Sequence, residues 1–149
     1  MQSEALLLSV RPMFVARILS GQKTTELRRV RPNVERSQLV LIYSSSPVMA
    51  VVASAVVEQV FTDSPAALWL RVRKTAGVSA VEYRAYFTGA ARASAICLSS
   101  VRALERPIGL SELRQHWPEF RPPQSYRFVG VNFERTHGEL RWLSPPKRT

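Results

Sequence analysis

One stretch of the sequence, from Arg11 to Arg29, limits the fold most, because it joins a short amphipathic helix to a strand that carries charges. Arg11-Pro12 suits the first turn of a helix, where proline lacks only an N–H that would have no partner. Apolar residues then recur at the spacing of one helix face: Phe14, Val15, Ile18 and Leu19. Gly21 predicts the end of the helix, because glycine readily takes the left-handed conformation of a helix stop.

A strand is predicted after Gly21, and it opens with Lys23. Alternation along this strand places side chains on two opposite faces: Thr24, Glu26 and Arg28 on one, Thr25 and Leu27 on the other. The simplest interpretation is a charged edge strand on a solvated surface, where Glu26 pairs with Arg28 or Lys23 and adds little stability. The alternative is a functional site at the turn between helix and strand.

The run Gly21-x-Lys23-Thr24-x-Glu26-x-Arg28, preceded by an Arg-Pro that begins a helix, resembles the signature of the ASCH domain. This family belongs to the PUA-like β-barrel group, which is related to the RNA-binding PUA, EVE and YTH domains. The resemblance implies an α+β fold, a PUA-like barrel of about six to seven mostly antiparallel strands with short flanking helices. The motif covers about the first fifth of the chain, and the later strands are compatible in order and length.

The rest of the pattern fits such a barrel. Strands are predicted at residues 5–10, 38–43, 48–60, 91–104, 125–133 and 139–143. Helices are predicted at residues 63–75, 80–88 and 111–117, with a turn at Pro107 and Gly109 and a hairpin through residues 136–138. The first two helices form an insertion near residues 63–89, which we expect to flank the site. We expect one domain over residues 1–144, followed by a basic tail at 145–149.

The charge of the chain predicts a polyanionic partner. The 149 residues are 46% hydrophobic, which is enough for one globular core, and the formal net charge is +10 with a pI near 11.0. Nucleic acid is the commonest polyanion that such basic domains bind. The resemblance favours RNA over duplex DNA, and no recognition helix or dimerising heptad is visible.

Several classes of site are not expected. Cys97 is the single cysteine, and His116 and His137 stand apart from it and from each other, so no Cys/His metal site can be assembled. No apolar run approaches the ~20 residues that cross a bilayer, and no signal peptide is visible. We therefore expect no metal, no cofactor, no membrane partner and a cytoplasmic location.

The first functional hypothesis is a binding module for RNA or a nucleotide. A pocket walled by Lys23, Glu26 and Arg28 would hold a phosphodiester or a base, with Glu26 accepting from an exocyclic amine or a ribose hydroxyl. Further cationic, hydroxyl, amide and stacking contacts are assigned to Arg11, Ser44, Ser45, Tyr86, Gln124 and Tyr126. The serines follow a strand beside Pro47, which also suits an ordinary turn.

The second hypothesis is a small hydrolase acting on RNA or on a modified nucleoside. Some ASCH members are similar to N4-acetylcytidine amidohydrolases, in which a lysine activates a threonine three residues later. Lys23 matches that lysine, but the position three residues on is Glu26, and Thr24 is adjacent to Lys23 instead. Other members are described as ribonucleases, and here Glu26 could deprotonate a 2′-hydroxyl while Lys23 or Arg28 holds the phosphorane. A third hypothesis, a DNA-binding regulator, rests on charge alone.

Overall fold

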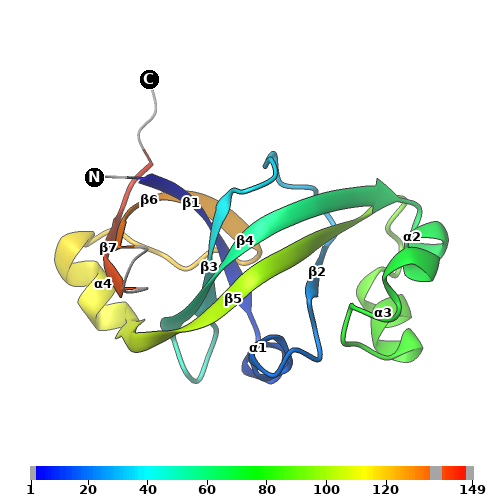
Figure 1. Cartoon of the computed structure of the whole chain (residues 1–149), viewed down its shortest axis with the longest axis horizontal. Coiled ribbons are helices and arrows are strands. Elements are labelled where there is room, and N and C mark those ends of the chain that lie inside the picture. The colour runs from blue at the N-terminus through cyan, green and yellow to red at the C-terminus, as the bar shows by residue number, and fades with distance from the viewer. Residues whose placement is uncertain (1–2, 135–138, 147–149) are drawn as a thin grey trace.

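The computed structural model describes residues 3–134 and 139–146. Its strands form one sheet in the order β2-β5-β4-β3-β1-β6-β7 (Figure 1). The strands are β1 (Ser3–Val10), β2 (Thr25–Arg28), β3 (Leu39–Ser44), β4 (Ala50–Asp63), β5 (Ala93–Gly109), β6 (Tyr126–Glu134) and β7 (Glu139–Ser144). The helices are α1 (Pro12–Leu19), α2 (Pro65–Val72), α3 (Ala80–Tyr86) and α4 (Leu110–His116). The expected α+β fold with seven mostly antiparallel strands is confirmed.

The apolar strand β1 lies near the middle of the sheet, where both of its faces are covered. It pairs in parallel with β3 and antiparallel with β6. Successive residues point to opposite sides, so Leu7 belongs to one core cluster while Leu6 and Leu8 belong to another. The parallel pair requires a crossover between β1 and β3, and this crossover contains α1 and β2. The motif is therefore built into the connection that leaves the centre of the sheet.

The sheet curls into a barrel. The end of β5 packs against β7: Leu104 and Ile108 of β5 lie in the same core cluster as Leu140 and Leu143 of β7. The second cluster is covered by α1, which contributes Val15 and Ile18. As predicted, α1 begins with Pro12, and Gly21 follows it with a φ of +84°.

The long hairpin of β4 and β5 carries α2 and α3 at its far end, beyond β2 (Figure 1). The Ser64 hydroxyl caps α2, and the predicted capping box of Ser79 and Glu82 starts α3. A third core cluster joins these helices to the sheet through Leu68, Tyr83 and Leu27. The helices thus stand beside the motif.

Three details differ from the sequence-based expectations. The strand of the motif begins at Thr25 rather than Lys23, because the N–H of Thr24 and that of Thr25 both donate to the Thr75 carbonyl. The turn expected at Pro107 and Gly109 is wrong, since β5 runs through both. Proline is tolerated there because the pairing with β4 is interrupted between residues 103 and 108. α4 then starts at Leu110, one residue before the predicted start at residue 111, with Gly109 at its N-cap. The predicted hairpin at 136–138 lies outside the described residues.

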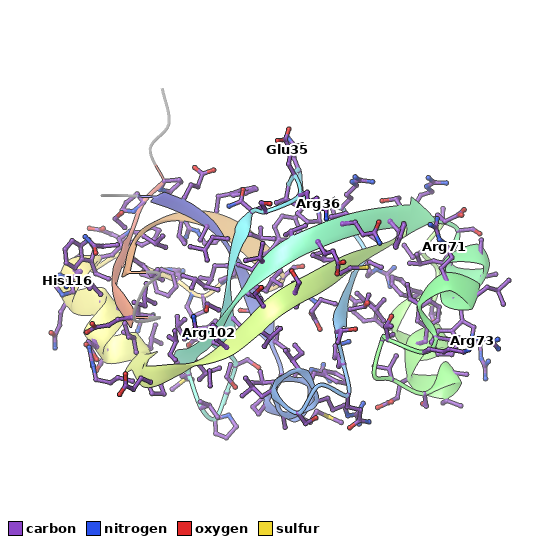
Figure 2. All side chains as sticks on the ribbon, viewed as in Figure 1. Glu35, Arg36, Arg71, Arg73, Arg102 and His116 are labelled. Carbon is purple, nitrogen blue, oxygen red and sulfur yellow. The ribbon has the colours of Figure 1, made fainter. Side chains whose placement is uncertain are left out.

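Basic side chains also occur far from the motif. Figure 2 shows Arg36 above the sheet, Arg71 and Arg73 at α2, and Arg102 on β5, and all four are exposed. The Arg71 guanidinium lies 3.8 Å from the centre of the Phe61 ring. Within the described residues, no helix is long and apolar enough to span a membrane.

Candidate functional site

A groove of about 840 Å³ lies at the point where β1 passes into α1. It is lined by the β1–α1 junction at residues 9–14, by Lys23 and β2, by the connection from β3 to β4, by α3, by Leu110 at the start of α4 and by residues 122–125. Segments that are distant in the sequence therefore share one concave surface.

Three charged side chains of the motif lie buried at the wall of this groove. Lys23, Glu26 and Arg28 are 2%, 3% and 7% exposed. The Lys23 ammonium is 3.4 Å from Glu26 Oε1, and Arg28 Nη1 is 2.5 Å from Glu26 Oε2. The motif is thus a buried ion triad, not a solvated edge. A triad of this kind costs desolvation free energy, which makes it weak support for stability and better support for a functional role.

The strand β2 presents two members of the triad because its side chains alternate, whereas Lys23 lies just before the strand. Glu26 and Arg28 share the face toward the groove. Thr25 is turned to the reverse face, where its hydroxyl donates to Thr75 Oγ1 at 2.9 Å. Antiparallel pairing with β5, Glu26 opposite Ile96, fixes the register that keeps this arrangement.

Lys23 is held from several sides. Its ammonium donates to the Ala76 carbonyl at 2.6 Å and lies 5.5 Å from the centre of the Phe14 ring. Burial lowers the pKa of Lys23 below its usual value, and the nearby Glu26 carboxylate partly opposes this shift. Arg28 and Arg17 lower it further through charge repulsion. The lysine is therefore an oriented, desolvated cation.

The groove contains buried hydrogen-bonding atoms without a hydrogen-bond partner. They are Ser9 Oγ, Arg28 Nε and Glu26 Oε2, although the last is in ionic contact with Arg28 Nη1. Other atoms of the Arg28 guanidinium are satisfied, since Nη1 donates to the Leu27 carbonyl at 2.8 Å and Nη2 to the Ser9 carbonyl at 2.9 Å. Unpaired buried polar atoms are rare in proteins. All three belong to residues lining the same groove, which points to a ligand.

The N-terminus of α1 adds a positive end to the lining of the groove. Arg11 is the N-cap residue, and its side chain makes no capping hydrogen bond. The first turn of the helix contains no acidic residue. Arg11, Met13 and Phe14 all line the groove. Helix N-termini attract anions through their free N–H groups and their dipole. This junction therefore suits a phosphate.

The structure brings most of the predicted site residues together. The groove is lined by Lys23, Glu26, Arg28, Arg11, Ser45, Tyr86 and Gln124. Thr24, Ser44 and Tyr126 do not line it. Thr24 is exposed before β2, and Ser44 points away because Tyr43 and Ser45, its neighbours in the sequence, face the groove. The Tyr126 hydroxyl donates to the Arg31 carbonyl at 3.2 Å instead.

Sequence reasoning missed several groove residues, of which Ser9, Met13, Tyr43, Met49 and Ser125 matter most. Tyr43 is the last residue of an apolar strand sequence, and nothing in that sequence distinguishes it from its neighbours. It is 2% exposed, and burial raises the pKa of its hydroxyl, with Arg114 opposing the shift. Ser125 reaches the groove because its carbonyl accepts from the Ser9 N–H at 3.0 Å.

The described residues contain no group of three or more His, Cys, Asp or Glu side chains arranged to hold a metal ion. The groove has two carboxylates, and both are already paired, Glu26 with Lys23 and Arg28 and Glu82 with Arg17. What the groove offers chemically is cations, hydroxyls and apolar surface around one buried carboxylate.

Comparisons with known proteins agree with this architecture. A curated protein described as an ASCH domain-containing ribonuclease, from Zymomonas mobilis subsp. mobilis, is 36% identical over 122 residues, which are 82% of each chain. The crystal structure of ASCH from Zymomonas mobilis is 32% identical, covers 89% of this chain and 90% of that chain, and has a TM-score of 0.78. A crystal structure of its tyrosine-to-phenylalanine variant has the same TM-score at 34% identity, over 83% of this chain and 88% of that one.

A model of the ASCH domain matches residues 8–120, a range that runs from the end of β1 to the segment after α4 and includes the whole motif. This protein belongs to the ASCH domain family, and it has the PUA-like fold of that family.

Proposed function

We propose that this protein binds single-stranded RNA in the groove and cleaves its phosphodiester backbone. The observation that carries the proposal is the buried triad of Lys23, Glu26 and Arg28 on the wall of a groove large enough for nucleotides. The relative named as a ribonuclease supports the choice of substrate. The net charge of +10 supports a polyanionic ligand in general.

The phosphate is assigned to the β1–α1 junction. There the N-terminal end of α1, the Arg11 side chain and the Nε–H of Arg28 supply donors and positive charge. The Ser9 hydroxyl has no hydrogen-bond partner at the same place. A bound phosphate would satisfy donors that are otherwise buried and unpaired.

Cleavage follows from the groups around that phosphate. Glu26 accepts the proton of the 2′-hydroxyl, and the 2′ oxygen attacks phosphorus while the bond from phosphorus to the 5′ oxygen breaks. Arg28 and Lys23 stabilise the charge of the phosphorane. The Tyr43 hydroxyl, whose pKa is raised by burial, keeps its proton at neutral pH and donates it to the departing 5′ oxygen. The products carry a 2′,3′-cyclic phosphate and a 5′-hydroxyl.

An amidohydrolase acting on N4-acetylcytidine is the weaker candidate. It needs a hydroxyl nucleophile beside Lys23, but Thr24 is exposed outside the groove and the Thr25 hydroxyl is bonded to Thr75 on the reverse face. No specific observation favours a DNA-binding regulator. Including N4-acetylcytidine and single-stranded DNA in the assay tests both alternatives directly.

The test is a cleavage assay on end-labelled, unstructured RNA, run with Mg²⁺ and with EDTA. We expect shortened RNA with cyclic phosphate ends, and no cleavage of DNA or of RNA methylated at every 2′ oxygen. Glu26→Gln should lower the rate by roughly 100-fold or more. Glu112→Gln is the matched control, because Glu112 is also paired with an arginine, Arg106, but on the surface.

The outcomes separate binding from catalysis. RNA that stays intact but binds, with an affinity that falls as salt is added, would contradict cleavage and leave the binding function alone. Equal rates for Glu26→Gln and Glu112→Gln would remove the triad from the mechanism. Release of acetate from N4-acetylcytidine without RNA cleavage would overturn the proposal in favour of the amidohydrolase.

A further inference from the structure

The groove is longer than one phosphate site requires, and hydrogen bonds and ion pairs show the order of its parts. The Ser45 N–H donates to the Val10 carbonyl at 2.9 Å, so the turn before β4 is attached to the end of β1. From there Arg28 Nη2 reaches the Ser9 carbonyl, Glu26 contacts Arg28, and Lys23 contacts Glu26. Lys23 in turn donates to Ala76, just before α3. The groove therefore extends from the β3–β4 turn to α3, with the phosphate site between.

Each end of this series carries an exposed apolar side chain. Met49, in the β3–β4 turn, is 44% exposed, and Tyr86, at the end of α3, is 41% exposed. Both line the groove, whereas most other exposed large apolar residues of the described chain do not. In Figure 1, α1 lies between the connection that holds Met49 and the helix that ends with Tyr86.

The backbone holds both side chains in place. Met49 has a φ of +52°, a conformation that costs a non-glycine residue free energy, and its carbonyl accepts from the Leu110 N–H at 3.0 Å. Tyr86 packs edge-on against Phe87, with ring centres 4.7 Å apart, and its carbonyl accepts from Arg29 Nη1 at 2.8 Å. Strained or fixed residues with exposed apolar surface are typical of ligand sites rather than of plain surface.

We infer that the groove has two base-binding subsites, one at Met49 and one at Tyr86, on either side of the scissile phosphate. This inference rests on the proposed function. A base stacks on the ring of Tyr86, and another packs on the polarisable thioether of Met49. The occupant is thus two successive unpaired nucleotides of an RNA strand. The charge complements this occupant, since the cations Arg11 and Arg28 lie at the junction between the two apolar ends.

The structural consequence is a defined substrate class. The protein acts on an internal phosphodiester of unpaired RNA, and a free nucleotide or nucleoside fills only half of the groove. A duplex is rejected, because paired bases cannot separate to reach the two ends.

The experiment removes one base at a time. A single-stranded RNA with one preferred cleavage point is prepared with an abasic unit at each position in turn, and cleavage rates are compared for the wild type, Met49→Ala and Tyr86→Ala. For the wild type, we expect loss of either base next to the cleaved bond to slow the reaction by roughly 5- to 100-fold. Met49→Ala should be insensitive to loss of one of these bases, and Tyr86→Ala to loss of the other.

Matched controls remove exposed apolar surface outside the groove. Val48→Ala changes the residue before Met49, and Val81→Ala changes a residue of α3; both side chains are exposed, and both should keep the wild-type response. Two results would contradict the subsites but not RNA cleavage. One is a cleavage rate that does not depend on the position of the abasic unit, and the other is that both variants are insensitive to loss of the same base. RNA that the wild type leaves intact would overturn the proposed function and the subsites together.

Discussion

Gly77 lies against Lys23 with no room for a side chain between them. A Cβ at residue 77 would overlap the Cβ of Lys23 and lie 2.9 Å from its Cα. The same glycine has a φ of +63°, and its carbonyl accepts from Arg17 Nη1 at 2.7 Å. The loop between α2 and α3 therefore packs directly against the motif lysine at the groove wall.

Replacing Gly77 should therefore damage the site as well as the fold. Gly77→Ala adds a clash to an unfavourable backbone conformation, and we expect a loss of about 1–3 kcal/mol in the free energy of unfolding. RNA cleavage should fall more than stability explains at a temperature where the variant is folded. Gly89→Ala is the control, because Gly89 has a φ of +78° but no atom within 4 Å of an added Cβ. Urea unfolding and cleavage rates measure the two effects; similar cleavage by both variants would contradict the role of the close contact.

The buried ammonium of Lys23 should appear in the pH dependence of stability. Burial lowers the pKa of Lys23 from 10.5, so the unfolded chain binds this proton more tightly than the folded protein does. The contribution of Lys23 to the free energy of unfolding must then rise as pH increases from its folded pKa toward 10.5. Lys23→Met, which keeps the Glu26–Arg28 pair, should lack this rise.

The measurement is urea unfolding of the wild type and Lys23→Met between neutral pH and the pKa of free lysine. Tyr43, Tyr83 and Cys97, whose pKa values are raised by burial, titrate in both proteins and cancel in the difference. A difference that grows in favour of the wild type as pH increases is expected. Two parallel curves would show that Lys23 is not desolvated in solution.

Arg17 should couple the helical insertion to the motif. Its guanidinium donates to the Gly77 carbonyl, contacts Glu82 at 3.4 Å and lies 5.1 Å from the centre of the Phe14 ring. Arg17→Ala should cost about 1 kcal/mol of stability and increase hydrogen exchange in residues 75–87. Arg106→Ala, which breaks the exposed pair with Glu112, should change neither exchange in that segment nor RNA cleavage. Unchanged exchange in Arg17→Ala would mean that packing alone holds the insertion.

Two residues of the sequence-based candidate set should prove dispensable. Thr24→Ala and Tyr126→Phe alter side chains that lie outside the groove, one exposed and the other bonded to Arg31. We expect cleavage and RNA affinity within about two-fold of the wild type, since such surface substitutions have small effects. Tyr43→Phe, the same change inside the groove, should instead slow cleavage by roughly 100-fold. A large effect of Thr24→Ala would revive a nucleophilic role for that hydroxyl.

The local chemistry of the motif was predictable from the sequence. Proline in the first turn, the glycine stop and the alternation of a strand depend on neighbouring residues only, and together they place Glu26 and Arg28 on one face. The family resemblance followed from the same short run, and both the fold and the family are confirmed. The apolar runs predicted that the strands exist. They did not predict where β5 ends, because an interruption in strand pairing leaves no signal in the sequence of one strand.

What the tertiary structure alone decided is which of these residues are buried together. Ser44 and Tyr43 are adjacent in β3 and equally buried, yet only Tyr43 lines the groove. Ser9, Met49 and Ser125 reach the groove through contacts between distant segments. The triad became a groove wall because Ala76 and Gly77, some fifty residues later in the chain, close over Lys23. Burial depends on non-local packing, so no local pattern of residues could have predicted it.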